Sequence, residues 1–248
     1  MACGYIALQN AGFEIEEYYA YEIDKFAIKC ASHNFPKIIH CGDVFEADFN
    51  RHCGIDWLIG GSPCTFWSIS NTKNRETKPE GIGYELFMQY VRAIKESAPK
   101  FFLYENNKSM SKDIRQAITD AFGFEPICIN SALLSAQHRE RLYWVGKRNP
   151  DGTYSKVEIE PPGDRGILLI DILEDPRDEK GYELGKYDLT QKEFEYMSRA
   201  VRDGRTHWDF GHHNESTNGK SRAITANMRK GVPYNVLVQT ISDRDDLQ

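Results

Sequence analysis

The sequence has no segment hydrophobic enough to cross a membrane. No apolar run in its 248 residues approaches the roughly 18 consecutive residues that a transmembrane helix needs. The first residues lack the basic-then-apolar pattern of a secretory signal, and there is no internal repeat or low-complexity tract. We therefore expect a cytoplasmic protein with no membrane partner.

Paired cysteines are absent too. The six cysteines, at positions 3, 30, 41, 53, 64 and 128, form no C-x-x-C pair and have no His-rich companion spacing. This pattern argues against a zinc site and against the disulfide framework of a small secreted protein. We expect reduced thiols and no metal ion.

The charge balance is acidic, with a formal net charge of −6, and 40% of the residues are hydrophobic. This composition fits one catalytic domain with a modest second lobe. It does not exclude a nucleic-acid partner, because a local basic face is sufficient for docking. Residues 199–231 contain seven Lys or Arg and three Asp or Glu, a net of +4. That stretch is either a DNA-facing patch or a solvated loop region.

Helix-like and strand-like segments alternate over residues 4–146, which is typical of a doubly wound α/β domain with a mostly parallel sheet. The predicted helices are 4–11, 24–33, 84–97 and 111–122, and the predicted strands are 17–23, 37–41, 55–59, 101–104 and 126–130. From Asn149 the chain is richer in Pro, Gly and charge. We therefore predict one domain over 1–147 and a smaller region over 148–248.

Cys64 lies in GGSPCTFWS, residues 60–68, directly after the predicted strand 55–59. Reactive groups of open parallel sheets gather beyond the carboxyl ends of the strands, and a Gly-Gly pair lets the backbone turn sharply there. Pro63 stiffens the chain before the thiol. Cys64 is thus a candidate nucleophile, although an isolated cysteine is more often a small buried hydrophobe.

A second candidate, Glu105, follows the predicted strand 101–104 in the segment YENN. The amphipathic helix 84–97 between the two strands predicts a crossover connection, so Cys64 and Glu105 should share one edge of the sheet. Further on, strand periodicity in SAQHRERLYWVG, residues 135–146, points Arg139 and Arg141 to the same side.

GGSPCTFWS, YENN and SAQHRERLYWVG, in this order, resemble three signature motifs of the cytosine-5 DNA methyltransferase family, most of all its compact phage and prokaryotic members. The resemblance covers residues 1–150 well. It implies a Rossmann-like S-adenosylmethionine-dependent catalytic domain with a small target-recognition lobe. Its partner would be double-stranded DNA with a flipped target cytosine. The sequence leaves the oligomeric state open, with a monomer as the simplest expectation.

A strand that ends in an acidic residue before a helix is a common ribose-binding arrangement, and Tyr21-Glu22-Ile23-Asp24 has this form. By resemblance, Glu22 takes the ribose hydroxyls of S-adenosylmethionine and Ile23 lies against the adenine. Asp24 is expected as a helix cap. Asp43 is similar to the family's adenine-amino ligand, and Val44 to a residue that packs on the ring. As isolated carboxylates both acids would more often be caps or surface charges.

The chain begins inside a segment similar to the family's Gly-rich cofactor loop, of which Met1, Cys3 and Gly4 resemble the second half. The resemblance adds Pro63 and Leu86 to the cofactor-binding residues. The family's late Gly-Asn motif does not occur before the last residue. Both cofactor-facing ends are therefore expected to be incomplete.

The resemblance implies covalent catalysis, with Cys64 adding to carbon 6 of cytosine. Glu105 would bind the ring-nitrogen edge, and Arg139 or Arg141 would favour the thiolate and hold the base or Glu105. The chain departs from the family at Thr65, where Gln or Asn is common, and at Asn107, where Val is commoner. Two aromatic residues after the nucleophile line the base pocket or simply pack in the core: Phe66 and Trp67.

Two rival functions remain. Some members of this family methylate transfer RNA, and activity on duplex DNA or on transfer RNA would separate the two. A catalytically silent nucleic-acid-binding remnant would bind no S-adenosylmethionine. The sequence gives neither the recognition site nor whether host or phage DNA is protected.

Overall fold

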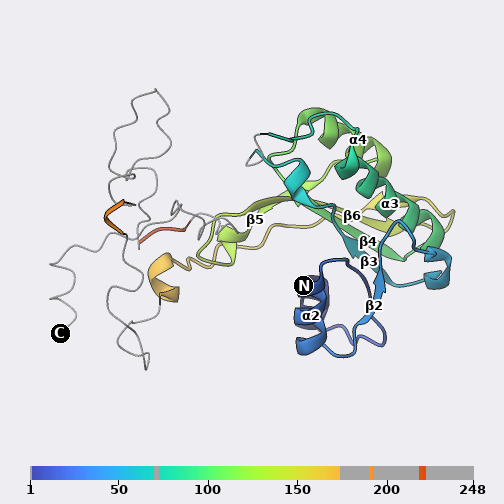
Figure 1. Ribbon diagram of the computed structural model, residues 1–248, viewed down its shortest axis with the longest axis horizontal. Coiled ribbons are helices and arrows are strands. Elements are labelled where there is room, and N and C mark those ends of the chain that lie inside the picture. Colours follow the sequence, from blue (N-terminus) through green and yellow to red (C-terminus); the bar gives the residue numbers. More distant parts are fainter. Residues whose placement is uncertain (1, 70–72, 174–189, 193–217, 222–248) are drawn as a thin grey trace. The chain divides into compact units, whose positions relative to one another are not determined.

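The computed structural model describes residues 2–69, 73–173, 190–192 and 218–221. The chain divides into two units, and Figure 1 shows the described elements of each. The first comprises Met1–Ile129 and Arg141–Ile159, and the second comprises Asn130–Glu140 and Glu160–Gln248. The predicted domain boundary at residue 147 stays a prediction.

The main sheet has the strand order β3-β4-β6-β5, with β7 paired to β6. β3 and β4 are parallel, whereas β6 runs antiparallel to β4 and to β7. Gly146 on β6 lies opposite Phe102 on β4, and a Cβ at Gly146 would collide with the Phe102 ring. The strands are Trp57–Gly60 (β3), Phe101–Asn107 (β4), Ile127–Asn130 (β5), Glu140–Arg148 (β6) and Tyr154–Lys156 (β7).

Two helices, α3 (Ile82–Ser97) and α4 (Lys112–Phe122), pack on one face of this sheet (Figure 1). The alternate residues Phe102, Tyr104 and Asn106 of β4 point to that face and are almost completely buried. Phe102 and Tyr104 pack in the larger hydrophobic core, which α3, α4, β4 and β6 build together. The carboxyl end of β4 is therefore anchored in the most deeply buried part of the first unit.

A second, two-stranded sheet lies in the N-terminal part. Its strands β1 (Tyr19–Tyr21) and β2 (Ile39–Gly42) are parallel, and Tyr21 lies opposite Gly42. The helices α1 (Cys3–Asn10) and α2 (Lys25–Asn34) accompany it. This part has its own small core around four buried residues: Ala2, Tyr5, Ala31 and Ile38.

The helix α1 contacts both sheets of the first unit. A Cβ added at Gly4 would lie 2.7 Å from the Tyr18 hydroxyl and 3.3 Å from Cγ2 of Ile59 on β3. Beyond the helix, the Phe13 ring meets Trp57 of β3 edge-on, with centroids 6.0 Å apart. Glycine at position 4 thus allows a close approach that any larger residue would disturb.

In the second unit, residues 218–221 lie beside residues 130–140. Ser221 N donates to the Ala136 carbonyl at 2.6 Å, and His138 N donates to the Ser221 carbonyl at 2.8 Å. Lys220 Nζ donates to the Ala132 carbonyl at 2.7 Å and lies 3.4 Å from Asp164 Oδ1. Lys220 therefore faces its own unit, and the other cations of the basic stretch 199–231 lie outside the described residues.

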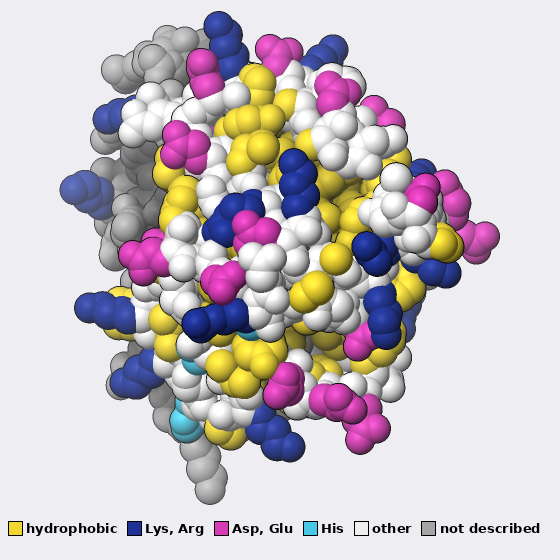
Figure 2. All heavy atoms as spheres, turned by 90° about the vertical axis from the view of Figure 1, so that its right-hand side faces the viewer, with side chains coloured by type: hydrophobic (Ala, Val, Ile, Leu, Met, Phe, Trp, Pro, Cys, Tyr) yellow, Lys and Arg dark blue, Asp and Glu magenta, His cyan; other side chains and the backbone are white. Residues whose placement is uncertain are grey.

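The predicted α/β class is confirmed, since strands and helices alternate as expected and β3 and β4 are parallel. The strand pattern did not specify the antiparallel direction of β6. Figure 2 shows one face of the molecule, on which cationic and acidic side chains interleave around hydrophobic ones. No helix among the described residues is long and apolar enough to span a membrane.

Candidate active site

The candidate nucleophile Cys64 begins a one-turn 3-10 helix, Cys64–Phe66, just beyond the end of β3. Its thiol is free and half-buried. The Cys64 carbonyl accepts hydrogen bonds from the backbone N–H groups of Trp67, at 3.1 Å, and Ser68, at 2.9 Å. At Gly61 the backbone passes so close to β4 that a Cβ would collide with the Glu105 carbonyl. The Gly-Gly turn therefore brings the nucleophile loop, residues 61–68, against the end of β4.

Side chains of β4 hold this loop by hydrogen bonds. The Tyr104 hydroxyl lies 2.5 Å from Ser62 Oγ and accepts from Ser62 N at 3.3 Å. Asn106 Nδ2 donates to the Ser62 carbonyl at 3.1 Å. Because Tyr104 is buried, its pKa rises to about 12, so the hydroxyl keeps its proton at neutral pH. The loop is thus fixed by polar groups that are themselves in the core.

Asn107, one of the two departures from the family pattern, also contacts the loop. Its Nδ2 donates to the Cys64 carbonyl at 3.4 Å, and its side chain is buried. The Oδ1 atom is buried, and within the described part of the chain it has no hydrogen-bond partner. Asn107 therefore bears directly on the position of the nucleophile.

Glu105 forms an ion pair with Arg141, with Arg141 Nε 2.9 Å from Oε1 of Glu105. The pairing of β4 with β6 explains the contact, because Asn107 lies opposite Arg141 and Glu105 is two residues away on the same strand. The Arg141 side chain is only 16% exposed and that of Glu105 is 39% exposed. The antiparallel direction of β6 thus places a guanidinium beside the candidate acid.

The other predicted arginine, Arg139, belongs to the second unit and is exposed. Its backbone N–H donates to Asn130 Oδ1 at 3.0 Å, and its carbonyl accepts from Ser131 N at 3.1 Å. A role for Arg139 beside the nucleophile stays a prediction.

The aromatic residues after Cys64 serve the core. Trp67 is fully buried in the larger hydrophobic cluster, and Phe66 packs against that cluster. Trp67 Nε1 donates to Glu76 Oε2 at 3.0 Å. For Trp67 the packing alternative is confirmed.

The predicted ribose and adenine residues come together at the carboxyl ends of β1 and β2. Because the two strands are parallel and Tyr21 lies opposite Gly42, Glu22 and Asp43 leave the sheet at the same edge. Glu22 Oε1 accepts from the N–H groups of Ile23 and Asp24, both at 2.9 Å. Asp43 Oδ1 accepts from Phe45 N at 3.0 Å.

Large apolar side chains lie exposed at this edge. Ile23 is 73% exposed and Phe26 is 72% exposed, while Phe45 is 43% exposed. Exposed apolar groups at the edge that carries Glu22 and Asp43 suit an aromatic ligand with polar substituents.

Asp24 is confirmed as a helix cap. Its Oδ1 accepts from Phe26 N at 2.8 Å and from Ala27 N at 2.9 Å, at the start of α2. The hydrogen bond from Ala27 and, to a smaller extent, that from Phe26 lower the pKa of Asp24 below its usual value.

The remaining predicted cofactor residues are distributed over several elements. Cys3 is exposed at the start of α1, and Gly4 lies against Tyr18 and Ile59. Pro63 precedes the nucleophile and is exposed, whereas Leu86 is half-buried on α3. Met1 lies outside the described residues. The cofactor roles of all these residues stay predictions.

Several residues that support the nucleophile loop and the loop after β2 were not identified from the sequence. The signal for Tyr104 and Asn106 was available, since polar groups on the buried face of a strand must find partners. Arg92 of α3 reaches the carbonyls of Val44 and Ala47, at 2.7 and 2.8 Å. No local pattern marks such a long-range contact.

Metal ligands do not gather in the described part of the chain. Within it, no group of three or more His, Cys, Asp or Glu residues could hold a metal ion. The arrangement present is instead a loop that carries Cys64, packed against the strand end that carries the Glu105–Arg141 ion pair, together with a carboxylate-lined edge of a parallel sheet. A thiol and a carboxylate at the end of parallel strands define a candidate nucleophilic transferase site.

Comparison with known proteins identifies the family. The family model described as C-5 cytosine-specific DNA methylase matches residues 3–245, nearly the whole chain. The chain belongs to this family.

Its relatives include phage and bacterial enzymes. The chain is 36% identical over 185 residues to the orphan methyltransferase M.SPRI of Bacillus phage SPR, covering 67% of this chain and 42% of that protein. It is 32% identical over 178 residues to the type II methyltransferase M1.ScrFI of Lactococcus lactis subsp. cremoris, covering 67% of this chain and 45% of that protein. The chain thus spans less than half the length of both relatives.

A solved structure also matches. It is described as a putative DNA modification methyltransferase encoded within a prophage (E. coli), with 25% identity and a TM-score of 0.43. The match covers 65% of this chain and 48% of that one.

Proposed function

We propose that this protein transfers a methyl group from S-adenosylmethionine to carbon 5 of cytosine in double-stranded DNA, through a covalent bond to Cys64. The observation that carries the proposal is the nucleophile loop. In a chain of the cytosine-specific methylase family, Cys64 is half-buried on a loop held by β4. The adjoining residue of that strand, Glu105, is paired with Arg141. Nucleophile, acid and cation thus occupy one edge of the sheet.

The residues at the edge of β1 and β2 fit the cofactor. Glu22 Oε1 is held by two backbone N–H groups, and among the described residues Oε2 has no hydrogen-bond partner. A carboxylate fixed in this way suits a pair of ribose hydroxyls. Asp43 would receive the adenine amino group, while Val44 and the exposed Ile23 would contact the ring. S-adenosylmethionine supplies an electrophilic methyl group.

Cys64 solves the chemical difficulty of the reaction. Carbon 5 of cytosine is a weak nucleophile, but addition of the Cys64 thiolate to carbon 6 gives an enamine that can attack. Glu105 would bind the amino and ring-nitrogen edge and stabilise protonation of that nitrogen as negative charge develops. Arg141 orients Glu105 through the 2.9 Å ion pair. After methylation, loss of the carbon 5 proton lets Cys64 depart and restores the aromatic ring.

The target cytosine must leave the base stack to reach Cys64, at a cost of a few kcal/mol. We infer that residues 148–248 supply the contacts that recognise the surrounding sequence. The family description, C-5 cytosine-specific DNA methylase, supports DNA as the substrate. By the same comparison, the protein would act in DNA modification.

Transfer of a labelled methyl group tests this proposal. We expect radioactivity from methyl-labelled S-adenosylmethionine to enter a DNA library, and nucleoside analysis to find it in 5-methylcytosine. Cys64→Ser should abolish turnover while leaving the thermal unfolding temperature unchanged, because the side chain is nearly isosteric and only half-buried.

Each other outcome contradicts the proposal. Methylation of transfer RNA but not of DNA would assign a different substrate. DNA binding without S-adenosylmethionine binding, unaffected by Cys64→Ser, would indicate a silent nucleic-acid-binding protein. Wild-type turnover by Cys64→Ser would exclude the covalent mechanism.

A further inference from the structure

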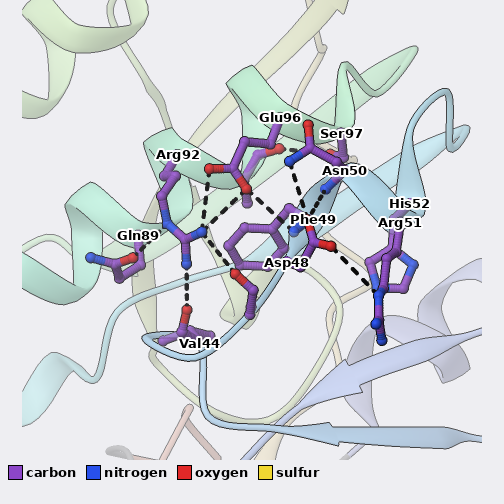
Figure 3. A network of polar contacts seen from close by, with 12 residues as sticks. Val44, Asp48, Phe49, Asn50, Arg51, His52, Gln89, Arg92, Glu96 and Ser97 are labelled. Atoms are coloured by element: carbon purple, nitrogen blue, oxygen red, sulfur yellow. Dashed lines mark hydrogen bonds and ion pairs between the residues drawn. The ribbon is translucent and has the colours of Figure 1, made fainter.

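Arg92 of α3 binds the backbone of the loop after β2, here called the β2 loop, residues 43–52. Arg92 Nη2 donates to the Val44 carbonyl at 2.7 Å, and Nη1 donates to the Ala47 carbonyl at 2.8 Å. Figure 3 shows the guanidinium lying between α3 and this loop. One side chain therefore fixes two carbonyls of a segment that precedes it by more than 40 residues.

The guanidinium is itself held in a fixed orientation. Its Nε donates to Gln89 Oε1 at 2.8 Å, and Nη1 lies 3.2 Å from Glu96 Oε2. Its Cζ lies 4.6 Å from the centroid of the Phe49 ring, a cation–π distance. Phe49 N donates to Glu96 Oε2 at 3.3 Å, so α3 binds the loop a second time. All three guanidinium nitrogens are thus engaged, and the side chain is half-buried.

The β2 loop begins with two of the residues assigned to the cofactor. Asp43 would receive the adenine amino group and Val44 would pack on the ring, an assignment that rests on the proposed function. Arg92 donates to the carbonyl of Val44 itself, one residue from Asp43. The neighbouring Phe45 is 43% exposed. The loop is therefore fixed on the side that faces α3, while part of it is open to solvent.

We propose that Arg92 is a positioning residue for the adenine end of S-adenosylmethionine. By holding the Val44 and Ala47 carbonyls, it fixes the direction of the Asp43 carboxylate and of the Val44 side chain. Arg92 acts through the loop, since its nitrogens are occupied by protein groups. A lysine could keep the charge and the pairing with Glu96, but a single ammonium cannot reproduce the planar set of donors.

If Arg92 has this role, its substitution should change cofactor affinity without changing the rate of the chemical step. A loosened β2 loop must be ordered each time the cofactor binds, which weakens binding. We expect Arg92→Lys to raise the Kd for S-adenosylhomocysteine roughly tenfold and to raise the KM for S-adenosylmethionine similarly. At saturating cofactor kcat should stay within about twofold, because Cys64 and Glu105 are carried by other elements.

The test is isothermal titration calorimetry with S-adenosylhomocysteine and its inosine counterpart, which carries an oxo group in place of the adenine amino group. The unsubstituted protein should prefer the adenosine compound, and Arg92→Lys should narrow that preference. Arg115→Lys is the matched control, because Arg115 on α4 forms an exposed ion pair with Glu125 at 2.9 Å. It should leave both affinities unchanged.

Hydrogen exchange supplies a readout that does not require cofactor. Amide protons of residues 43–52 should exchange faster in Arg92→Lys, while those of β4 keep their protection. Unchanged exchange in that loop, or an unchanged preference between the two ligands, would overturn the proposal.

Two further outcomes separate this proposal from the proposed function. An unsubstituted protein that binds neither ligand would overturn the cofactor assignment and with it the role of Arg92. Ligand binding as predicted, together with full turnover by Cys64→Ser, would contradict the covalent mechanism but not the role of Arg92.

Discussion

The nucleophile loop and the β2 loop are held in place in different ways. The nucleophile loop rests on Tyr104, Asn106 and Asn107, all buried at the end of the strand that carries Glu105. The β2 loop is held by side chains of the neighbouring helix α3, chiefly the half-buried Arg92, and by one buried aromatic ring of its own. The first loop is therefore fixed by a strand of the core, whereas the second is fixed mainly by side chains of a neighbouring helix.

This difference suits the two tasks assigned to the loops. Covalent catalysis needs a nucleophile fixed against its acid, and a buried polar network gives that rigidity at the expense of tolerance to substitution. A cofactor must enter and leave at each turnover, and a loop held by partly exposed polar side chains is compatible with that exchange. Substitutions of the buried side chains that support the first loop should therefore change stability, those of its reacting residues should change kcat, and those at the second loop should change cofactor affinity.

The largest of these effects is expected at the acid. Glu105→Gln keeps the volume of the side chain but removes the charge that pairs with Arg141. We expect kcat to fall by about 10²- to 10⁴-fold, with cofactor affinity unchanged, because the substitution removes general acid–base assistance. Steady-state methylation and calorimetry measure the two quantities.

The control for that experiment is Glu125→Gln, which removes an exposed ion pair with Arg115. It should leave kcat unchanged. Equal kcat in Glu105→Gln and the unsubstituted protein would contradict the role of the acid.

The next effect concerns the support of the nucleophile loop. Tyr104→Phe deletes the hydroxyl that contacts Ser62 and leaves buried polar groups without a partner. We expect the free energy of unfolding to fall by about 1–3 kcal/mol, measured by urea denaturation. Tyr84→Phe is the control, because that hydroxyl has no hydrogen-bond partner among the described residues. An equal effect of both substitutions would argue that the contacts to Ser62 are unimportant.

Tyr104 also predicts a dependence of stability on alkaline pH. Burial raises its pKa to about 12, above the ordinary value of about 10. The raised pKa means that the folded state binds this proton more tightly than the unfolded state. The resulting stabilisation is complete below pH about 10 and is lost as the pH rises towards 12. Between these pH values, urea denaturation should show that the free energy of unfolding falls less in Tyr104→Phe than in the unsubstituted protein. An identical dependence on pH in the two proteins would contradict the assignment of this effect to Tyr104.

The smallest effect is expected at the cofactor edge, in the cap of α2. Asp24→Ala should lower the thermal unfolding temperature slightly at neutral pH, because two backbone N–H groups lose their acceptor. The lowered pKa gives stability that is present above the ordinary value of 3.8 and is lost as the pH falls through the lowered one. The difference in thermal unfolding temperature between Asp24→Ala and the unsubstituted protein should therefore become smaller as the pH is lowered. Asp24→Ser keeps a cap without charge and should remove the pH dependence.

Much of the architecture follows from local sequence patterns. The crossover helix between two apolar strands predicted that β3 and β4 are parallel neighbours, which is confirmed. The strand-turn-helix pattern predicted the cap at Asp24. These features could be read from the sequence because neighbouring segments determine them.

The supports of both loops could not be predicted in the same way. The resemblance implied that Arg139 or Arg141 would hold Glu105, but the choice of Arg141 depends on β6 running antiparallel to β4, and a strand pattern does not encode direction. Arg92 and Val44 are 48 positions apart. The sequence shows Asn107 only as a departure from the family's commoner Val, and the packing places it against the Cys64 carbonyl.

Covalent trapping tests the central claim most directly. A DNA duplex library containing 5-fluorocytosine, incubated with the protein and S-adenosylmethionine, should yield a stable adduct because fluorine blocks the final proton loss. We predict a protein–DNA bond that mass spectrometry assigns to Cys64 and that Cys64→Ser abolishes. An adduct that persists in Cys64→Ser, or methylation of ordinary DNA without any adduct on the fluorinated duplex, would contradict the account.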